Sequence, residues 1–166
     1  MMRVSIVITN YNFGQFLPDA IQSALDVRWP DKEVIVCDDG STDNSRTVIE
    51  SFSDQIIAIY KANGGQPSAA NAAFASITGD IIFFLDSDDL LLPQAAEVVT
   101  HVWDKETAKV QFPMIVIDQD GVSNGKVGLA PRSLALRAIR ARYVAQSRSK
   151  VLELILSLAG AAASRR

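Results

Sequence analysis

Three carboxylates stand within four residues in the segment Asp86-Ser87-Asp88-Asp89, directly after the apolar run Ile81-Ile82-Phe83-Phe84-Leu85. Two carboxylates one residue apart at the end of a strand can both face one hard cation. Mg²⁺ and Mn²⁺ take oxygen ligands from a protein and a diphosphate together. We therefore predict that Asp86 and Asp88 bind Mn²⁺ or Mg²⁺. The alternative is a solvated acidic turn in which Asp89 caps the following helix.

A second polar segment, 38–43, follows the apolar run 33–37 and begins Asp38-Asp39-Gly40. Gly40 allows a positive φ or a close approach of the backbone, and a carboxylate just ahead of it can accept hydrogen bonds from a nucleoside base or ribose. Asp38 and Asp39 are therefore candidate nucleotide-binding residues. The alternative is an Asx-turn with Ser41 or Asp43 as a helix N-cap.

Two further strand ends carry weaker signals. In Thr9-Asn10-Tyr11-Asn12 the aromatic ring could stack on a base, although a tyrosine at the start of a loop can equally pack on its own domain. The segment Asn63-Gly64-Gly65-Gln66 matches no phosphate-binding loop, because it has neither the GxGxxG spacing nor a Walker lysine.

The elements that must position these residues alternate along the chain. Four short apolar runs, continuous rather than alternating in polarity, are typical of strands covered on both faces. Segments with helical spacing lie between them, so an α/β fold with a mostly parallel sheet and helices on both faces is expected. In such sheets ligands bind beyond the carboxyl ends of the strands. The predicted strands are 4–8, 33–37, 56–60 and 81–85, and the predicted helices are 16–25, 48–52, 67–77 and 93–103.

The composition changes after the fourth predicted helix. Residues 109–118 are strand-like, and turn signals follow at Asp120-Gly121 and Asn124-Gly125. We expect a nucleotide-binding domain over 1–125 and a basic C-terminal tail over 126–166, in which a helix over about 133–158 is predicted despite irregular apolar spacing.

Charge divides the chain in the same place. Residues 1–125 hold 7 Lys and Arg against 18 Asp and Glu, whereas residues 126–166 hold 9 against 1. An acidic body without a basic stripe argues against nucleic acid as a partner. The basic tail instead predicts a peripheral contact with anionic membrane headgroups. The single cysteine, Cys37, lies in an apolar run and is expected to be a buried small hydrophobe.

No signal peptide pattern opens the sequence, and no apolar stretch reaches about 18 residues. We therefore expect a cytoplasmic protein, either free or peripheral to the inner face of the membrane.

In combination, the segments 4–12, 34–45, 63–71 and 79–93 resemble the N-terminal part of the inverting family 2 glycosyltransferases, which have the Rossmann-like GT-A fold. The resemblance covers roughly residues 2–118. It implies metal-dependent transfer of a sugar from a nucleotide-diphosphate sugar to an acceptor hydroxyl with inversion. A UDP-sugar is the first expectation for the donor. The acceptor would be a glycan, a lipid or a protein, as in cell wall or polysaccharide biosynthesis.

The resemblance also implies roles for single residues. Thr9 and Tyr11 would flank the nucleobase, and Asp39 would bind its polar edge. Asp86 and Asp88 would be the acidic positions of the DXD motif, with Asp86 near the ribose or the metal and Asp88 on the metal. The family's usual asparagine in the third helix would be the nucleotide-binding residue Asn71, but the basic residue often found just before it is Ala70 here.

The chain departs from the family pattern in its C-terminal part. Family enzymes continue for about a hundred residues that hold the acceptor site and a carboxylate base, because an acceptor hydroxyl needs a base during transfer. Past Asp120 the only acidic residue is Glu153, and a Gln-x-x-Arg-Trp sequence is missing. No catalytic base is assigned, and a C-terminally incomplete fold is expected. A non-catalytic nucleotide-sugar-binding module, or an inactive remnant of such an enzyme, is the alternative function.

Two other classes fit less well. A receiver-type signalling domain would need a lone aspartate after the third strand, where Tyr60-Lys61 stands. A nucleotidyltransferase usually opens with a Gly-rich loop that carries Arg or Lys, and segment 9–14 has no basic residue.

Overall fold

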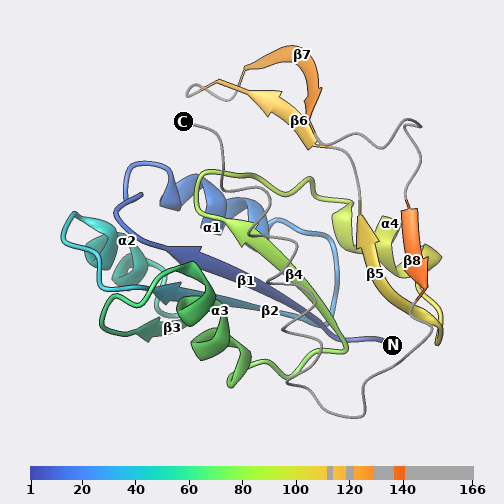
Figure 1. The fold of residues 1–166 in the computed structure, drawn as a ribbon, viewed down its shortest axis with the longest axis horizontal. Helices are drawn as coiled ribbons and strands as arrows, with labels where there is room; N and C mark the ends of the chain where they lie inside the picture. The colour runs from blue at the N-terminus through green and yellow to red at the C-terminus, as the bar shows by residue number, and fades with distance from the viewer. Residues whose placement is uncertain (112–113, 119–121, 129–136, 141–166) are drawn as a thin grey trace.

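The computed structural model describes residues 1–111, 114–118, 122–128 and 137–140 (Figure 1). Strands and helices alternate through the first hundred residues, as predicted. The strands in this part are β1 (Val4–Asn10), β2 (Lys32–Asp38), β3 (Ile57–Tyr60) and β4 (Ile81–Asp86). The helices are α1 (Leu17–Leu25), α2 (Ser45–Ser51), α3 (Gln66–Phe74) and α4 (Ala95–Val102).

The four strands form one sheet in the order β3-β2-β1-β4, and every neighbouring pair is parallel. This confirms the predicted fold class. The register pairs Asn10 with Asp38 and Thr9 with Asp86, so the polar residues at the strand ends come to one edge of the sheet. Parallel pairing therefore assembles side chains that are up to 77 residues apart in the sequence.

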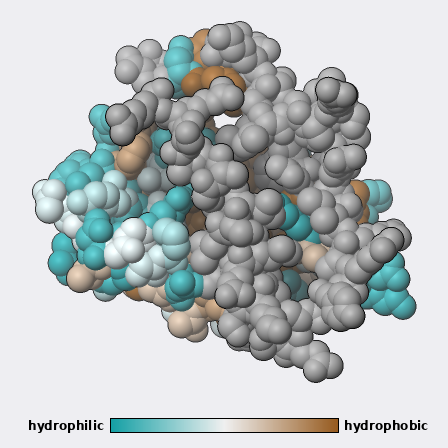
Figure 2. All heavy atoms as spheres, viewed as in Figure 1, coloured by the Kyte–Doolittle hydropathy of each residue, from teal (hydrophilic) through white to brown (hydrophobic). Residues whose placement is uncertain are grey.

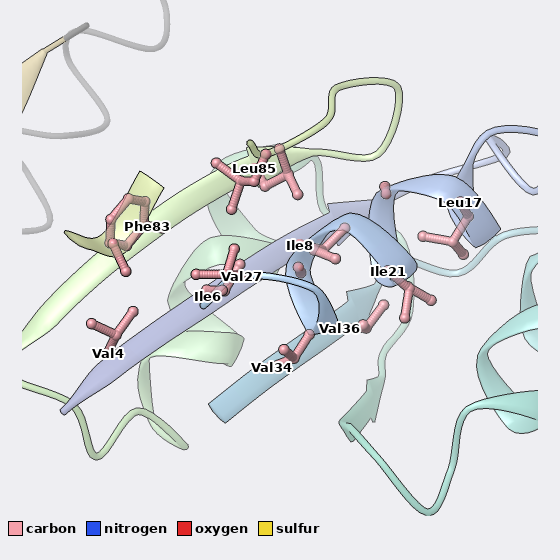
Figure 3. Packing of buried hydrophobic residues seen from close by; sticks show 14 of the residues in the cluster. Val4, Ile6, Ile8, Leu17, Ile21, Val27, Val34, Val36, Phe83 and Leu85 are labelled. Carbon is pink, nitrogen blue, oxygen red and sulfur yellow. The ribbon is translucent and has the colours of Figure 1, made fainter. Parts of the chain in front are cut away.

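Side chains alternate between the two faces of the sheet, and each face has its own apolar core. On one face, β1, β2 and β4 pack with α1 and Val27 around Ile6, Ile8 and Val36 (Figure 3). On the other face, Val7, Ile35 and Cys37 pack against the alanines of α3. Helices therefore cover both faces, as expected, and Cys37 is a buried side chain within the second core. Burial raises the pKa of its thiol to about 11.

The C-terminal part of the described chain forms two antiparallel pairs. β5 (Thr107–Gln111) pairs with β8 (Arg137–Arg140), and β6 (Met114–Ile117) pairs with β7 (Ser123–Gly128). The strand predicted over 109–118 is thus divided between β5 and β6.

The prediction of a helix over 133–158 is wrong for residues 137–140, which form β8; the rest of that segment lies outside the described residues. Pairing with β5 satisfies the backbone of this stretch, and such pairing overrides a weak helix propensity.

Helix α2 and the β6–β7 hairpin differ in the polarity of the side chains that they expose. The surface over α2 is mainly hydrophilic, whereas hydrophobic atoms are visible at the β6–β7 hairpin (Figure 2). Its exposed apolar residues are Ile115, Val116 and Val122. No helix within the described ranges is long and apolar enough to span a membrane.

Glu33 organises the opposite edge of the sheet from the polar strand ends. Its carboxylate accepts hydrogen bonds from Ser5 Oγ (2.5 Å), Thr78 N (2.7 Å), Thr78 Oγ1 (2.9 Å) and Arg3 Nη2 (3.2 Å). These bonds join β1, β2 and the turn that precedes β4. Burial alone would raise the pKa of Glu33, but the donors hold it below its ordinary value of 4.5.

We predict that Glu33→Gln lowers the free energy of unfolding by about 2–3 kcal/mol, because the new amide places donors against donors and hydrogen bonds to charged groups are among the strongest. Urea denaturation at neutral pH would measure this. Glu50→Gln, at the exposed pair of Glu50 with Arg46, is the control and should cost no more than about 0.5 kcal/mol.

The lowered pKa of Glu33 also sets the pH dependence. The carboxylate stabilises the fold fully above the ordinary pKa of 4.5, and this contribution is lost as the pH falls through the lower pKa of the folded state. The stability difference between wild type and Glu33→Gln should therefore shrink below about pH 4.5. A difference that is constant from pH 7 to pH 3 would contradict this assignment.

Candidate functional site

A pocket of about 460 Å³ lies at the carboxyl ends of the parallel strands. Five of the predicted site residues line this pocket. They come from the ends of the first, second and fourth strands. The third strand end contributes residues of the loop between β3 and α3. The lining residues are Thr9, Asn10, Tyr11, Phe13, Asp39, Asn63, Gly65, Gln66, Ala69, Asp86, Ser87 and Asp88.

The alternation along the strands decides which carboxylate after β2 reaches the pocket. Asp38 continues the face of Val36, which is covered by α1, and it is buried there. It accepts hydrogen bonds from Asn10 Nδ2 (2.9 Å), Ser41 N (3.0 Å) and Ser41 Oγ (2.5 Å). Asp38 does not line the pocket, and its hydrogen bonds fix the loop after β2 to the end of β1. Asp39 continues the face of Cys37, on which α3 lies.

Asp39 is buried at the pocket wall and is held by one loop. Its carboxylate forms an ion pair with Lys61 and accepts the backbone N–H groups of Gly64 (3.0 Å) and Gly65 (2.7 Å). Burial alone would raise the pKa of Asp39, but these donors lower it. Gly65 has a φ of 85°, a conformation that suits glycine and turns its N–H toward the carboxylate. Asp39 is therefore ionised and fixed in orientation at neutral pH.

The acidic segment after β4 carries uncompensated negative charge. Partial desolvation and the charge of Asp88 raise the pKa of Asp86, against a 2.7 Å hydrogen bond from Gln66 Nε2. Burial, Asp88 and Asp86 raise the pKa of Asp89 to about 6. α4 begins at Ala95, so Asp89 does not cap it. The acidic turn therefore concentrates charge at the pocket without a capping role.

The donor set fits a cation that is shared with a bound anion. Among the described residues, no cluster of three or more His, Cys, Asp or Glu side chains is placed to hold a metal ion. Asp86 and Asp88 alone would leave most positions of an octahedral Mg²⁺ or Mn²⁺ open. A diphosphate and water would supply the missing oxygens, and a cation between the two carboxylates and a phosphate would relieve their mutual repulsion.

Other predicted residues occupy different positions. Tyr11 lines the pocket and stays 46% exposed, so the ring is available to a ligand and is not packed into its own domain. Asn71 lies on α3 with an exposed side chain and does not line the pocket. Asp43 accepts the N–H of Ser45 (3.0 Å), the first residue of α2, and that of Gly14 (2.8 Å), so its role is structural, but the N-cap of α2 is Asn44 and not Asp43.

Two site residues that the sequence did not indicate lie at the two ends of the connection from β3 to α3. Lys61 and Gln66 contact the two acidic positions Asp39 and Asp86, although neither was a candidate. The only available signal was the position of Asn63-Gly64-Gly65-Gln66 at a strand end, and a sequence pattern does not show which carboxylate such a loop reaches.

Comparison with known proteins agrees with this geometry. An uncharacterized glycosyltransferase of Nostoc is 40% identical over 122 residues, which are 70% of this chain and 38% of that protein. A UDP-Glc:α-D-GlcNAc-diphosphoundecaprenol β-1,3-glucosyltransferase of Escherichia coli is 32% identical over 79% of this chain and 53% of its own length. The chain thus spans about half or less of these relatives.

The fold is also found in solved structures. A mannosyltransferase of Pyrobaculum calidifontis, in complex with GDP-Man and Mn²⁺, superposes with a TM-score of 0.57 at 22% identity, over 64% of this chain and 34% of that one. This likeness shows a shared GT-A fold. The sequence model described as "Glycosyl transferase family 2" matches residues 5–157. The chain therefore belongs to glycosyl transferase family 2.

Proposed function

We propose that this chain binds a nucleotide-diphosphate sugar through a divalent cation, as the donor half of an inverting glycosyl transfer. The observation that carries the proposal is the convergence of Asp39, Asp86 and Asp88 on one pocket at the carboxyl ends of a parallel sheet. Its volume of about 460 Å³ falls in the usual range for small-ligand sites. The E. coli relative named for UDP-Glc makes a UDP-sugar the first candidate.

Residues at the two ends of the pocket would bind different parts of the ligand. Tyr11 offers a ring for stacking on the base, and the fixed, ionised Asp39 is an acceptor for its N–H groups. At the other end, Asp86 and Asp88 would hold Mn²⁺ or Mg²⁺ against the diphosphate. Such a cation would neutralise the charge that develops on the leaving diphosphate. No base for the acceptor hydroxyl is assigned, and Glu153 lies outside the described residues.

The contact with a membrane and the chemical class of the acceptor stay predictions. The basic segment 126–166 is proposed to contact anionic lipid headgroups at the inner face of the membrane, with a glycan or lipid acceptor nearby. Its support is the excess of Lys and Arg in that segment. Most of the segment lies outside the described residues.

We predict that UDP binds more tightly in Mn²⁺ than in EDTA. Asp88→Asn should lower this Mn²⁺-dependent increase in UDP affinity at least about tenfold, since the loss of even an indirect partner of a metal typically costs that much in metal affinity. Calorimetric titration of UDP under both conditions measures it. The fold should not be weakened, because the change relieves repulsion. Asp54→Asn, at an exposed turn outside the pocket, is the matched control. Equal UDP affinity of wild type in Mn²⁺ and in EDTA would refute the metal bridge.

We also predict that Tyr11→Ala weakens UDP binding roughly tenfold, because stacking on an aromatic ring contributes about 1–3 kcal/mol per base. The loss should be similar with Mn²⁺ and with EDTA, since the ring acts on the base end. Tyr60→Ala is the control: Tyr60 is 38% exposed, and its ring packs under the Arg46 guanidinium, outside the pocket. An unchanged affinity of Tyr11→Ala would remove the stacking role.

A further inference from the structure

The loop between β3 and α3, together with the first residue of α3, contacts both acidic ends of the pocket. At its first part, Lys61, Gly64 and Gly65 bind the carboxylate of Asp39. Directly after the loop, Gln66 donates from Nε2 to Asp86 Oδ1 at 2.7 Å. β1 lies between β2 and β4 in the sheet, so the loop crosses the end of β1 to reach from one carboxylate to the other.

Gln66 is held in place by this arrangement. It is the first residue of α3, followed by Pro67, whose ring fixes the backbone at the start of the helix. The residue before it, Gly65, is bound to Asp39 and has a positive φ. The amide of Gln66 therefore projects toward Asp86 from a backbone that is constrained on both sides.

We propose that Gln66 is a positioning residue for the cation site, a role that rests on the proposed function. Its amide holds Asp86 in the orientation in which the carboxylate meets the cation and the diphosphate. The bond uses one lone pair of Oδ1, so Oδ2 remains free for a metal. Partners that orient metal-binding carboxylates in this way are typically worth about 10–100-fold in metal affinity.

The test compares Gln66→Met with wild type, because methionine keeps the length of the side chain and removes the donor. UDP is titrated with Mn²⁺ and with EDTA. The dissociation constant in EDTA divided by that in Mn²⁺ measures the gain from the metal. We expect Gln66→Met to lower this ratio about tenfold or more, with a much smaller change of UDP affinity in EDTA.

Gln22→Met is the matched control, since Gln22 Nε2 donates to Asp26 Oδ1 at 2.9 Å on the exposed side of α1, outside the pocket. Its ratio should equal that of wild type. A Gln66→Met ratio at or above the wild-type value would overturn the proposal, as would an equal loss of UDP affinity with Mn²⁺ and with EDTA. If wild type itself shows no gain from Mn²⁺, the proposed function fails first, which separates the two outcomes.

Discussion

Asp39 is a buried carboxylate whose oxygens are held by three donors from a single loop, and the shape of the pocket depends on this contact. Lys61, Gly64 and Gly65 would each lose a partner if the carboxylate were removed. Hydrogen bonds to a charged group are worth about 1.5–3 kcal/mol each. They offset the desolvation of Asp39 and place the start of α3 beside the strand ends. Through this contact the loop becomes a wall of the pocket that reaches Asp86.

The sheet supplies the second constraint, because each strand sends alternate side chains to opposite faces. Val7, Ile35 and Cys37 pack against α3, and the residues that continue this face past the strand ends line the pocket. Asp38 points to the other face and binds Asn10 and Ser41. The two adjacent carboxylates thus have different surroundings: Asp38 binds neighbouring loop residues, and Asp39 lines the pocket. At the far edge Glu33 joins the same strands, so polar contacts fix both ends of the sheet.

Much of this arrangement could be predicted from the sequence. Continuous apolar runs identified the parallel strands, and the polar strand ends contain Thr9, Tyr11, Asp39, Asp86 and Asp88, which line one pocket. The alternation of side chains along β2 also separates Asp38 from Asp39. It predicts their faces only if the last residue of the strand is known. The contacts of the loop after β3, and the pairing of β8 with β5, depend on tertiary placement that local patterns do not contain. In particular, local propensity favoured a helix at residues 137–140, whereas pairing with β5 makes them a strand.

We propose that the cation lies at Asp86 and Asp88 only when a nucleoside diphosphate shares it. Paramagnetic broadening of backbone amide signals by Mn²⁺ tests this directly on the isotope-labelled chain. With UDP present, broadening should centre on Ser87, Gln66 and Asn63 and should leave Thr78, at the opposite edge of the sheet, unaffected. Without UDP the same Mn²⁺ concentration should broaden these signals far less. Equal broadening with and without UDP, or broadening centred on another part of the molecule, would contradict the account.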